Sequence, residues 1–172
     1  MPSRIEIIET DIFNVQAQAI IVSSTPSLLP ETPATEALYI AAGPKLAEEC
    51  AHVAPCEAGE ARITRGYNLL ADFVIHTTAP IWGGGESGED EQLANCYKNS
   101  FELATSYDIS TLAISPLIVA EDGFPQMRAT HIAMHEIIAF LKNNIAMKRI
   151  ILSCPDEETV KVYEAAFDKC NA

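Results

Sequence analysis

Positive charge is scarce in this sequence. It contains 11 Lys and Arg against 24 Asp and Glu, which gives a formal net charge of −13 at pH 7. Non-specific binding to nucleic acids and to anionic membranes depends mainly on Lys and Arg that neutralise phosphate groups. The charge therefore argues against nucleic acid and membrane surfaces as general partners. It leaves room for a small phosphorylated ligand, because backbone N–H groups at a helix N-terminus bind phosphate without a basic side chain.

Long apolar runs and paired cysteine motifs are also missing. The first residues, MPSRIEIIETD, lack the apolar segment of a signal peptide. No run approaches the roughly 18 apolar residues of a membrane helix, so we expect a cytoplasmic protein. The five cysteines are an odd number without a C-x-x-C pair, which favours reduced thiols over a disulfide framework.

Common catalytic signatures are absent as well. The sequence has no G-x-S-x-G, P-loop or H-E-x-x-H motif. The segment from Gly83 to Gly88 formally matches the dinucleotide pattern G-x-G-x-x-G. Glu86 and the acidic residues that follow it place negative charge where a pyrophosphate needs hydrogen-bond donors. We therefore interpret the segment as a turn that leads into a helix with an acidic first turn.

Two groups of side chains are candidates for metal binding. The first is His131 and His135 on one predicted helix, with Glu136 directly after them. The second is Cys50, His52 and Cys56 near the end of another predicted helix. The first group has no third ligand at a recognisable spacing, and the second lacks the fourth ligand of a structural zinc site. The sequence therefore predicts neither a metal nor a cofactor. A nucleophilic Cys-His pair stays open, because such pairs are assembled in space.

The pattern that is present is that of an α/β fold. The length of 172 residues suits one domain, and the 48% hydrophobic content is enough for a sizeable core. Short apolar runs predict strands at Ile5 to Ile8, Ala19 to Val22, Phe73 to Ile75, Leu112 to Ile114 and Ile150 to Leu152, with a further strand or hairpin around Glu60 to Asn68. Helical spacing predicts helices at Thr35 to Ala51, Asp90 to Ser106, Gln126 to Lys142 and Asp156 to Lys169, the last with Asp156 as N-cap. This alternation indicates a largely parallel sheet with helices on both faces.

Six segments, in order and over nearly the whole chain, carry a more specific resemblance: ETDIFNVQAQAIIV, AAGPKLAEEC, GEARITRGYNL, FVIHTTAPIW, LANCYKNSFELA and DGFPQMRA. Together they resemble the macro domain family. The resemblance implies a single three-layer α/β/α macro domain over residues 1–172, with a mixed, largely parallel sheet of about six strands. Members of this family recognise ADP-ribose, and some hydrolyse ADP-ribosyl esters or O-acetyl-ADP-ribose.

The resemblance places the adenine end of a ligand site at two positions. The family motif G-D-I appears here as Thr10-Asp11-Ile12, so Asp11 corresponds to the aspartate that accepts a hydrogen bond from the adenine amino group, with Ile12 beside it. The aromatic residue that often stacks on adenine is replaced by Pro155. Such stacking contributes roughly 1–3 kcal/mol, so the replacement weakens adenine binding.

The first ligand loop departs from the family pattern. Val22 to Thr25 replaces N-A-A-N, Pro30 to Pro33 replaces a glycine run, and Ala34-Thr35-Glu36 replaces V-D-G. Proline has no N–H to donate and forbids the φ values that glycine supplies. The groups that orient the distal ribose and a catalytic water in active relatives are therefore changed. The ligand positions that the resemblance assigns to this loop are Ser23, Ser24, Thr25 and Thr35.

The second ligand loop departs in charge. Ile118 to Pro125 replaces S-T-G-I-Y/F-G-F-P, so that Glu121 and Asp122 stand where relatives have an apolar and an aromatic residue. A carboxylate 4 Å from a phosphate, at an effective dielectric near 20, would be repelled by about 4 kcal/mol. Micromolar binding corresponds to only about 8 kcal/mol. The ligand positions assigned to this loop are Ala120, Asp122, Gly123 and Phe124.

Three functional hypotheses follow. The first is a non-catalytic module with a degenerate pocket that binds an ADP-ribose-like small molecule or acts as an interaction domain. The second is a hydrolase for ADP-ribosyl esters or O-acetyl-ADP-ribose, in which Glu36 or Glu121 acts as general base and hydroxyls of the first loop position the sugar. The third is a structural subunit whose site is filled by Pro and Leu side chains. The sequence identifies no protein partner.

Overall fold

The computed structural model describes residues 3–118 and 123–171. Within these ranges the strands are β1 (Ile5–Glu9), β2 (Ala19–Ser23), β3 (Ala61–Arg65), β4 (Phe73–Thr77), β5 (Thr111–Ile114) and β6 (Arg149–Cys154). The α-helices are α1 (Pro33–Ala42), α2 (Pro44–Val53), α3 (Glu89–Ser106), α4 (Gln126–Lys142) and α5 (Glu157–Cys170), and a short 3-10 helix, η1 (Ile12–Asn14), follows β1. None of the helices in the described ranges is long and apolar enough to cross a bilayer.

The strands form one sheet in the order β1-β6-β5-β2-β4-β3. Every neighbouring pair is parallel except β3 and β4, which are antiparallel with Ile63 opposite Ile75. The strand or hairpin expected around Glu60 to Asn68 is therefore the edge strand β3. The mixed, mostly parallel sheet confirms the fold class that the resemblance implies.

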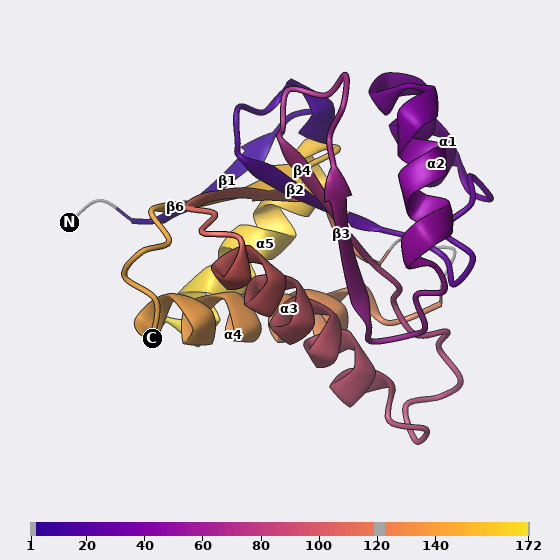
Figure 1. Ribbon diagram of the computed structural model, residues 1–172. Helices are drawn as coiled ribbons and strands as arrows, with labels where there is room; N and C mark the ends of the chain where they lie inside the picture. The colour runs from indigo at the N-terminus through magenta and orange to yellow at the C-terminus, as the bar shows by residue number, and fades with distance from the viewer. Residues whose placement is uncertain (1–2, 119–122, 172) are drawn as a thin grey trace.

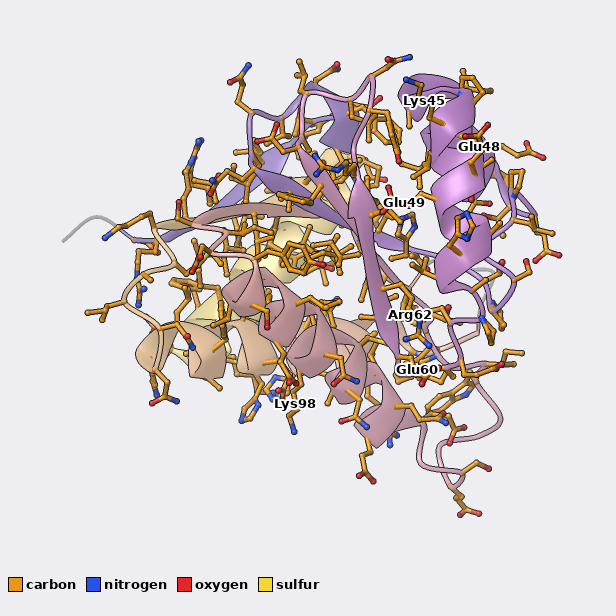
Figure 2. The ribbon with its side chains drawn as sticks, viewed as in Figure 1. Lys45, Glu48, Glu49, Glu60, Arg62 and Lys98 are labelled. Atoms are coloured by element: carbon orange, nitrogen blue, oxygen red, sulfur yellow. The ribbon has the colours of Figure 1, made fainter. Side chains whose placement is uncertain are left out.

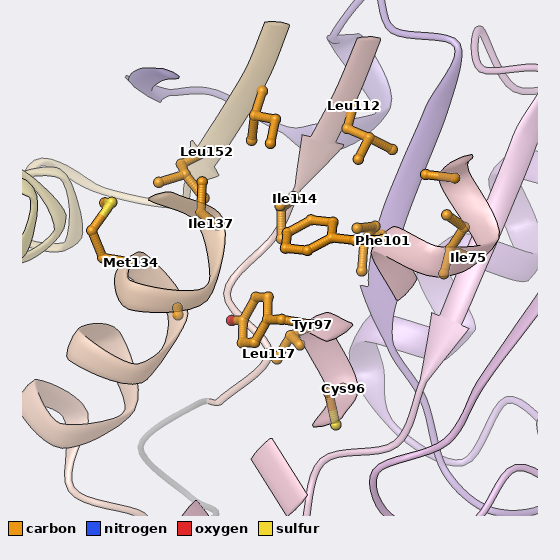
Figure 3. Packing of buried hydrophobic residues seen from close by; sticks show 14 of the residues in the cluster. Ile75, Cys96, Tyr97, Phe101, Leu112, Ile114, Leu117, Met134, Ile137 and Leu152 are labelled. Atoms are coloured by element: carbon orange, nitrogen blue, oxygen red, sulfur yellow. The ribbon is translucent and has the colours of Figure 1, made fainter. Parts of the chain in front are cut away.

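Alternate residues of each central strand pack against different helices. On β2, Ala19 and Ile21 join the cluster formed by α3, α4 and α5, whereas Ile20 and Val22 join the cluster formed by α1 and α2. This alternation follows from the period of two along a strand. Figure 1 shows the resulting three layers, and Figure 3 shows apolar side chains of the sheet, α3 and α4 meeting in the larger cluster.

The single helix expected at Thr35 to Ala51 is wrong, because the chain forms two helices there. Gly43 separates them with a φ of +91°, a conformation that L side chains rarely adopt, and Pro44 starts the second helix without needing an N–H partner. The break lets α1 and α2 pack on the same face of the sheet. Along α2, Leu46 is buried, while the exposed Lys45 and Glu48 lie on its outer side (Figure 2).

The other long helices occur where their periodicity predicts them. Asp156 caps the N-terminus of α5 by accepting a hydrogen bond from the backbone N–H of Thr159 at 2.8 Å, as the sequence predicts. At the carboxyl edge of the sheet, β2 leads toward α1 on one face and β5 leads to α4 on the other. Ligands of open α/β sheets bind in crevices at such points.

Candidate ligand-binding site

A cavity of about 920 Å³ opens at the carboxyl ends of β1, β5 and β6. Its described lining comes from the ends of β1 and β6, from the segments that follow the three strands, from the N-terminal halves of α4 and α5, and from one residue of α3. Ligand cavities usually measure about 300–1,000 Å³, so this one has room for a nucleotide. The position agrees with the general rule for parallel sheets.

The residues expected at the adenine end lie together at this cavity. Asp11, Ile12 and Pro155 all line it. Asp11 is exposed, and its Oδ1 accepts a hydrogen bond from the backbone N–H of Phe13 at 3.0 Å, which caps η1. The backbone N–H of Thr10 donates to the carbonyl of Cys154 at 3.0 Å and ties the ends of β1 and β6 together. One carboxylate oxygen of Asp11 therefore holds the local backbone, and the other is available to a ligand.

The border of the cavity is acidic. Glu9, Asp11 and Asp156 line it, and the described lining residues include no Lys or Arg. Hydrogen bonds from Thr159 hold the pKa of Asp156 below its usual range, so this carboxylate stays ionised at neutral pH. The site therefore offers acceptors and negative charge to an entering ligand.

Aromatic residues form the wall beside the second ligand loop. Phe124 lines the cavity, and its ring lies against Trp82 with centroids 4.6 Å apart. The guanidinium of Arg128 lies 5.1 Å from the centre of the Trp82 ring and forms an ion pair with Asp90, with Nε 2.8 Å from Oδ1. Gly123 has a φ of +78°, which lets the chain turn beside this wall.

The remaining expected positions of the second loop, Ala120, Glu121 and Asp122, lie outside the described residues. Trp82 was not among the sequence candidates. Its signal was its presence as the single tryptophan, directly before the glycine-rich segment.

The first ligand loop bonds to itself and to the α1/α2 layer. Ser23, Ser24 and Thr25 are not among the residues that line the cavity. The hydroxyl of Thr25 lies 3.3 Å from the hydroxyl of Ser27, which in turn donates to the carboxylate of Glu31 at 2.9 Å. The polar side chains between β2 and α1 are thus used within the loop.

An apolar residue anchors the same loop. Leu28 is 1% exposed, packs in the core under α1 and α2, and adopts a φ of +60°. Its carbonyl accepts a hydrogen bond from the hydroxyl of Tyr39, and the carbonyl of Pro26 accepts one from the backbone N–H of Cys56 at 2.9 Å. The loop is therefore part of the packed fold, and Leu28 fills the space behind it.

Thr35 occupies the N-terminus of α1 as a capping residue. The hydroxyls of Thr32 and Thr35 form a capping box, in which the N–H of Thr35 donates to Thr32 Oγ1 at 3.2 Å and the N–H of Thr32 donates to Thr35 Oγ1 at 2.9 Å. Thr35 is 2% exposed and does not line the cavity. Glu36 is exposed on the first turn of α1 and is also not part of the described lining.

The glycine-rich segment binds a carboxylate of the chain itself. The carboxylate of Glu89, itself 1% exposed, accepts hydrogen bonds from the backbone N–H groups of Gly83, Gly85 and Ser87 at 2.8, 2.9 and 2.7 Å. These donors, the N–H of Gly85 first, lower the pKa of Glu89 to about 2. The segment therefore uses its N–H groups to hold the acidic first turn of α3.

The histidines and cysteines do not form a metal-binding cluster within the described residues. Cys50 and His76 are buried with Sγ and Nε2 4.0 Å apart, and His76 Nε2 lies 2.9 Å from the hydroxyl of Thr64. On the surface, His131 Nδ1 lies 3.5 Å from Cys170 Sγ. The remaining members of the two candidate groups lie apart from these pairs: His135 faces Glu136 at 3.3 Å, His52 is exposed and Cys56 bonds to the carbonyl of Glu60.

The sequence matches the family model described as Macro domain over residues 23–133. A macro domain-containing protein of Methanosarcina mazei is 41% identical over 166 residues, which cover 96% of this chain and 89% of that protein. A Citrobacter rodentium protein named O-acetyl-ADP-ribose deacetylase is 36% identical and covers 95% of both chains. A crystal structure of a Trypanosoma brucei macrodomain in complex with ADP-ribose has a TM-score of 0.87 at 28% identity, covering 98% of this chain and 69% of that one.

Proposed function

This chain belongs to the macro domain family, and from that premise we propose that it binds an ADP-ribose-like nucleotide without hydrolysing it. The similar Trypanosoma brucei macrodomain was crystallised with ADP-ribose. The cavity of this chain lies at the carboxyl ends of the sheet and includes Asp11 and Ile12. Asp11 keeps one carboxylate oxygen for an adenine amino group, because the other caps η1.

The observation that carries the non-catalytic part of the proposal is the closed capping box of Thr32 and Thr35. Active relatives, by resemblance, place an aspartate at the position of Thr35. Here the hydroxyl of Thr35 also donates to the carbonyl of Thr32 at 3.0 Å and is buried under the helix. A hydroxyl committed in this way neither orients a ribose nor activates a water, since a threonine needs an adjacent base to act in catalysis.

The affinity that we propose is modest. Pro155 offers no ring face to adenine, which removes a stacking contribution of roughly 1–3 kcal/mol. The cavity also holds three carboxylates at its border and no Lys or Arg in its described lining. We therefore expect a dissociation constant for ADP-ribose above about 10 µM, equivalent to less than roughly 7 kcal/mol.

The second candidate is an O-acetyl-ADP-ribose deacetylase, which the name of the Citrobacter rodentium relative favours. Such a reaction needs a general base near the distal ribose, and this assistance alone contributes about 10²–10⁴-fold to the rate. Glu36 is exposed on α1 away from the described cavity lining. Of the two bases that the sequence suggests, this leaves Glu121, which lies outside the described residues.

Calorimetric titration and a turnover assay test the two parts separately. Titration with ADP-ribose should give a measurable but weak isotherm, and incubation with O-acetyl-ADP-ribose should release acetate no faster than buffer. A flat titration at millimolar ADP-ribose would remove the nucleotide-binding proposal. Steady acetate release that disappears in Glu121→Gln, but not in Glu36→Gln, would replace it with the hydrolase.

A further inference from the structure

Two buried tyrosines line the cavity, and they come from other elements than the residues assigned to adenine. Tyr97 comes from α3 and is 2% exposed, and Tyr163 comes from α5 and is 5% exposed. Figure 3 shows the Tyr97 ring beside Leu117, with its hydroxyl oxygen directed away from α3 toward the space between α3 and α4. We refer to Tyr97 and Tyr163 as the tyrosine floor.

Neither hydroxyl of the tyrosine floor has a hydrogen-bond partner among the described residues. Two other hydroxyls of the cavity lining have partners: Thr130 donates to the carbonyl of Gln126 at 2.8 Å, and Ser153 donates to the carbonyl of Thr10 at 2.9 Å. The buried side-chain oxygens that lack a partner in the described residues belong to Thr78 and Ser100, so the oxygens of Tyr97 and Tyr163, which line the cavity, are not closed off from it. Within the described part of the chain, the two hydroxyls are therefore free to bond water or a ligand that enters the cavity.

The floor is uncharged and donates hydrogen bonds. Burial is the main cause that raises the pKa of both tyrosines, so their hydroxyls stay protonated at neutral pH. The walls above them are apolar and include Leu117, Ile118 and Phe124. A planar group with a hydrogen-bond acceptor fits such surroundings, because its faces contact the apolar walls while its acceptor meets the hydroxyls.

The carboxylates of the cavity lining disfavour an anionic group beside Tyr97 and Tyr163. Glu9, Asp11 and Asp156 are exposed residues of the cavity lining, and the described lining contains no cationic side chain. An anion that passed into the floor would leave water without gaining a counter-charge. An uncharged group of the same shape avoids that cost.

We propose that the tyrosine floor is a second subsite, separate from the adenine end, which binds an uncharged aromatic carboxamide or an equivalent planar group through hydrogen bonds donated by Tyr97 and Tyr163. This subsite does not depend on the proposed binding of ADP-ribose. It assigns to the interior of the cavity a preference for neutral aromatic groups that carry an acceptor.

Benzamide and benzoate form a matched pair of probes, because they share one shape and differ in charge. Ligand-detected NMR and titration should show that benzamide binds the wild-type protein. Benzoate should bind at least about tenfold more weakly, because its negative charge would leave water without gaining a counter-charge. Equal binding of the two probes, or no binding of benzamide at millimolar concentration, would overturn the proposal.

The variants Tyr97→Phe and Tyr163→Phe test whether benzamide binds beside these two hydroxyls. Each substitution removes one hydroxyl and should weaken benzamide roughly 2- to 10-fold, the range for one neutral hydrogen bond. Tyr107→Phe is the matched control, because Tyr107 lies at the end of α3, is 48% exposed and does not line the cavity. Benzamide affinity that is the same in the Tyr97→Phe, Tyr163→Phe double variant as in the control would contradict the assignment.

Thermal unfolding of the same variants separates a binding role from a structural one. Removal of a hydroxyl without a protein partner should leave the melting temperature unchanged or raise it. A clear fall would mean that the hydroxyls are bonded within the fold, and the proposal would fail. ADP-ribose titrated into the same samples reports separately on the nucleotide proposal, so the failure of one is distinguishable from the failure of the other.

Discussion

The hydroxyl of Thr35 donates to the carbonyl of Thr32 at 3.0 Å, while its oxygen accepts the N–H of the same residue at 2.9 Å. This reciprocal contact places both polar functions of Thr35 at the start of α1. It explains how a loop whose glycines are replaced by prolines still ends in a regular helix, because the capping box satisfies N–H groups that the helix itself leaves free.

Thr35→Ala should therefore lower the stability of the protein and spare ligand binding. Loss of a capping side chain costs about 1 kcal/mol, measurable as a shift in the urea midpoint. Affinity for ADP-ribose should stay within error of wild type, since Thr35 does not line the cavity. A variant with normal stability but weaker binding would show that Thr35 acts on the ligand.

Pro155→Phe should strengthen the binding of adenine nucleotides. Pro155 is exposed at the border of the cavity, one residue before the N-cap of α5, so a ring has space there. Stacking on adenine should add about 1–3 kcal/mol to the binding free energy of ADP-ribose. Pro155→Leu is the control, because it adds apolar surface without a ring face, and calorimetry of the pair separates stacking from burial. Equal gains in the two variants would rule out stacking.

Asp11→Ala should weaken adenine nucleotides by about 1–3 kcal/mol, because the adenine amino group would lose its acceptor. Asp11→Asn serves as the companion variant. Its side-chain oxygen continues to accept the Phe13 N–H that caps η1, and its amide nitrogen then faces the adenine amino group. Titration of ADP-ribose should show losses in both variants. Normal affinity in Asp11→Asn would mean that the carboxylate contributes only through η1.

The buried His76 should make the protein sensitive to acid. Burial lowers the pKa of His76 from 6.5 to about 4, while nearby Glu49 opposes the shift. The unfolded chain therefore binds a proton that the folded chain does not, and stability falls as the pH drops from 6.5 toward 4. The shift corresponds to about 3 kcal/mol.

His76→Gln, which retains a polar group for Thr64, should flatten this dependence in urea unfolding at pH 7, 5.5 and 4.5. Glu89, whose pKa is lowered from 4.5 to about 2 in the folded chain, begins to lower stability as the pH approaches 4.5, and this contribution is common to the variant and the wild type. A slope of the same size in the variant would assign the effect to other groups.

The strength of a local pattern decided what could be predicted about the fold. The ranges of α3, α4 and α5 follow directly from long helical periodicity, and Asp156 as N-cap from its side chain and spacing. The Gly43-Pro44 pair is the sequence signal for the break between α1 and α2. It was missed because the alanine-rich spacing on both sides continues the helical pattern across it.

The site was predictable where the family motif could be aligned with a strand end. The resemblance assigns Asp11 and Pro155 to one site, and both line the cavity because they follow β1 and β6, neighbouring parallel strands whose carboxyl ends share one edge. The roles of Leu28, Tyr97 and Tyr163 were not accessible in this way. Spacing predicts each of them only as a residue of the interior, and only the three-dimensional surroundings separate Leu28 in the core from Tyr97 and Tyr163, which line a cavity.

Because Glu89 accepts three hydrogen bonds from the glycine-rich segment, a phosphate from solution has to compete with its carboxylate for the same N–H donors. A carboxylate tethered so near its donors acts at an effective concentration on the order of millimolar or higher. A phosphate from solution would have to displace this internal anion before it reached the N–H groups. At neutral pH the segment therefore behaves as an anion site that the chain itself saturates, and incoming nucleotides are left to the cavity at the ends of β1, β5 and β6.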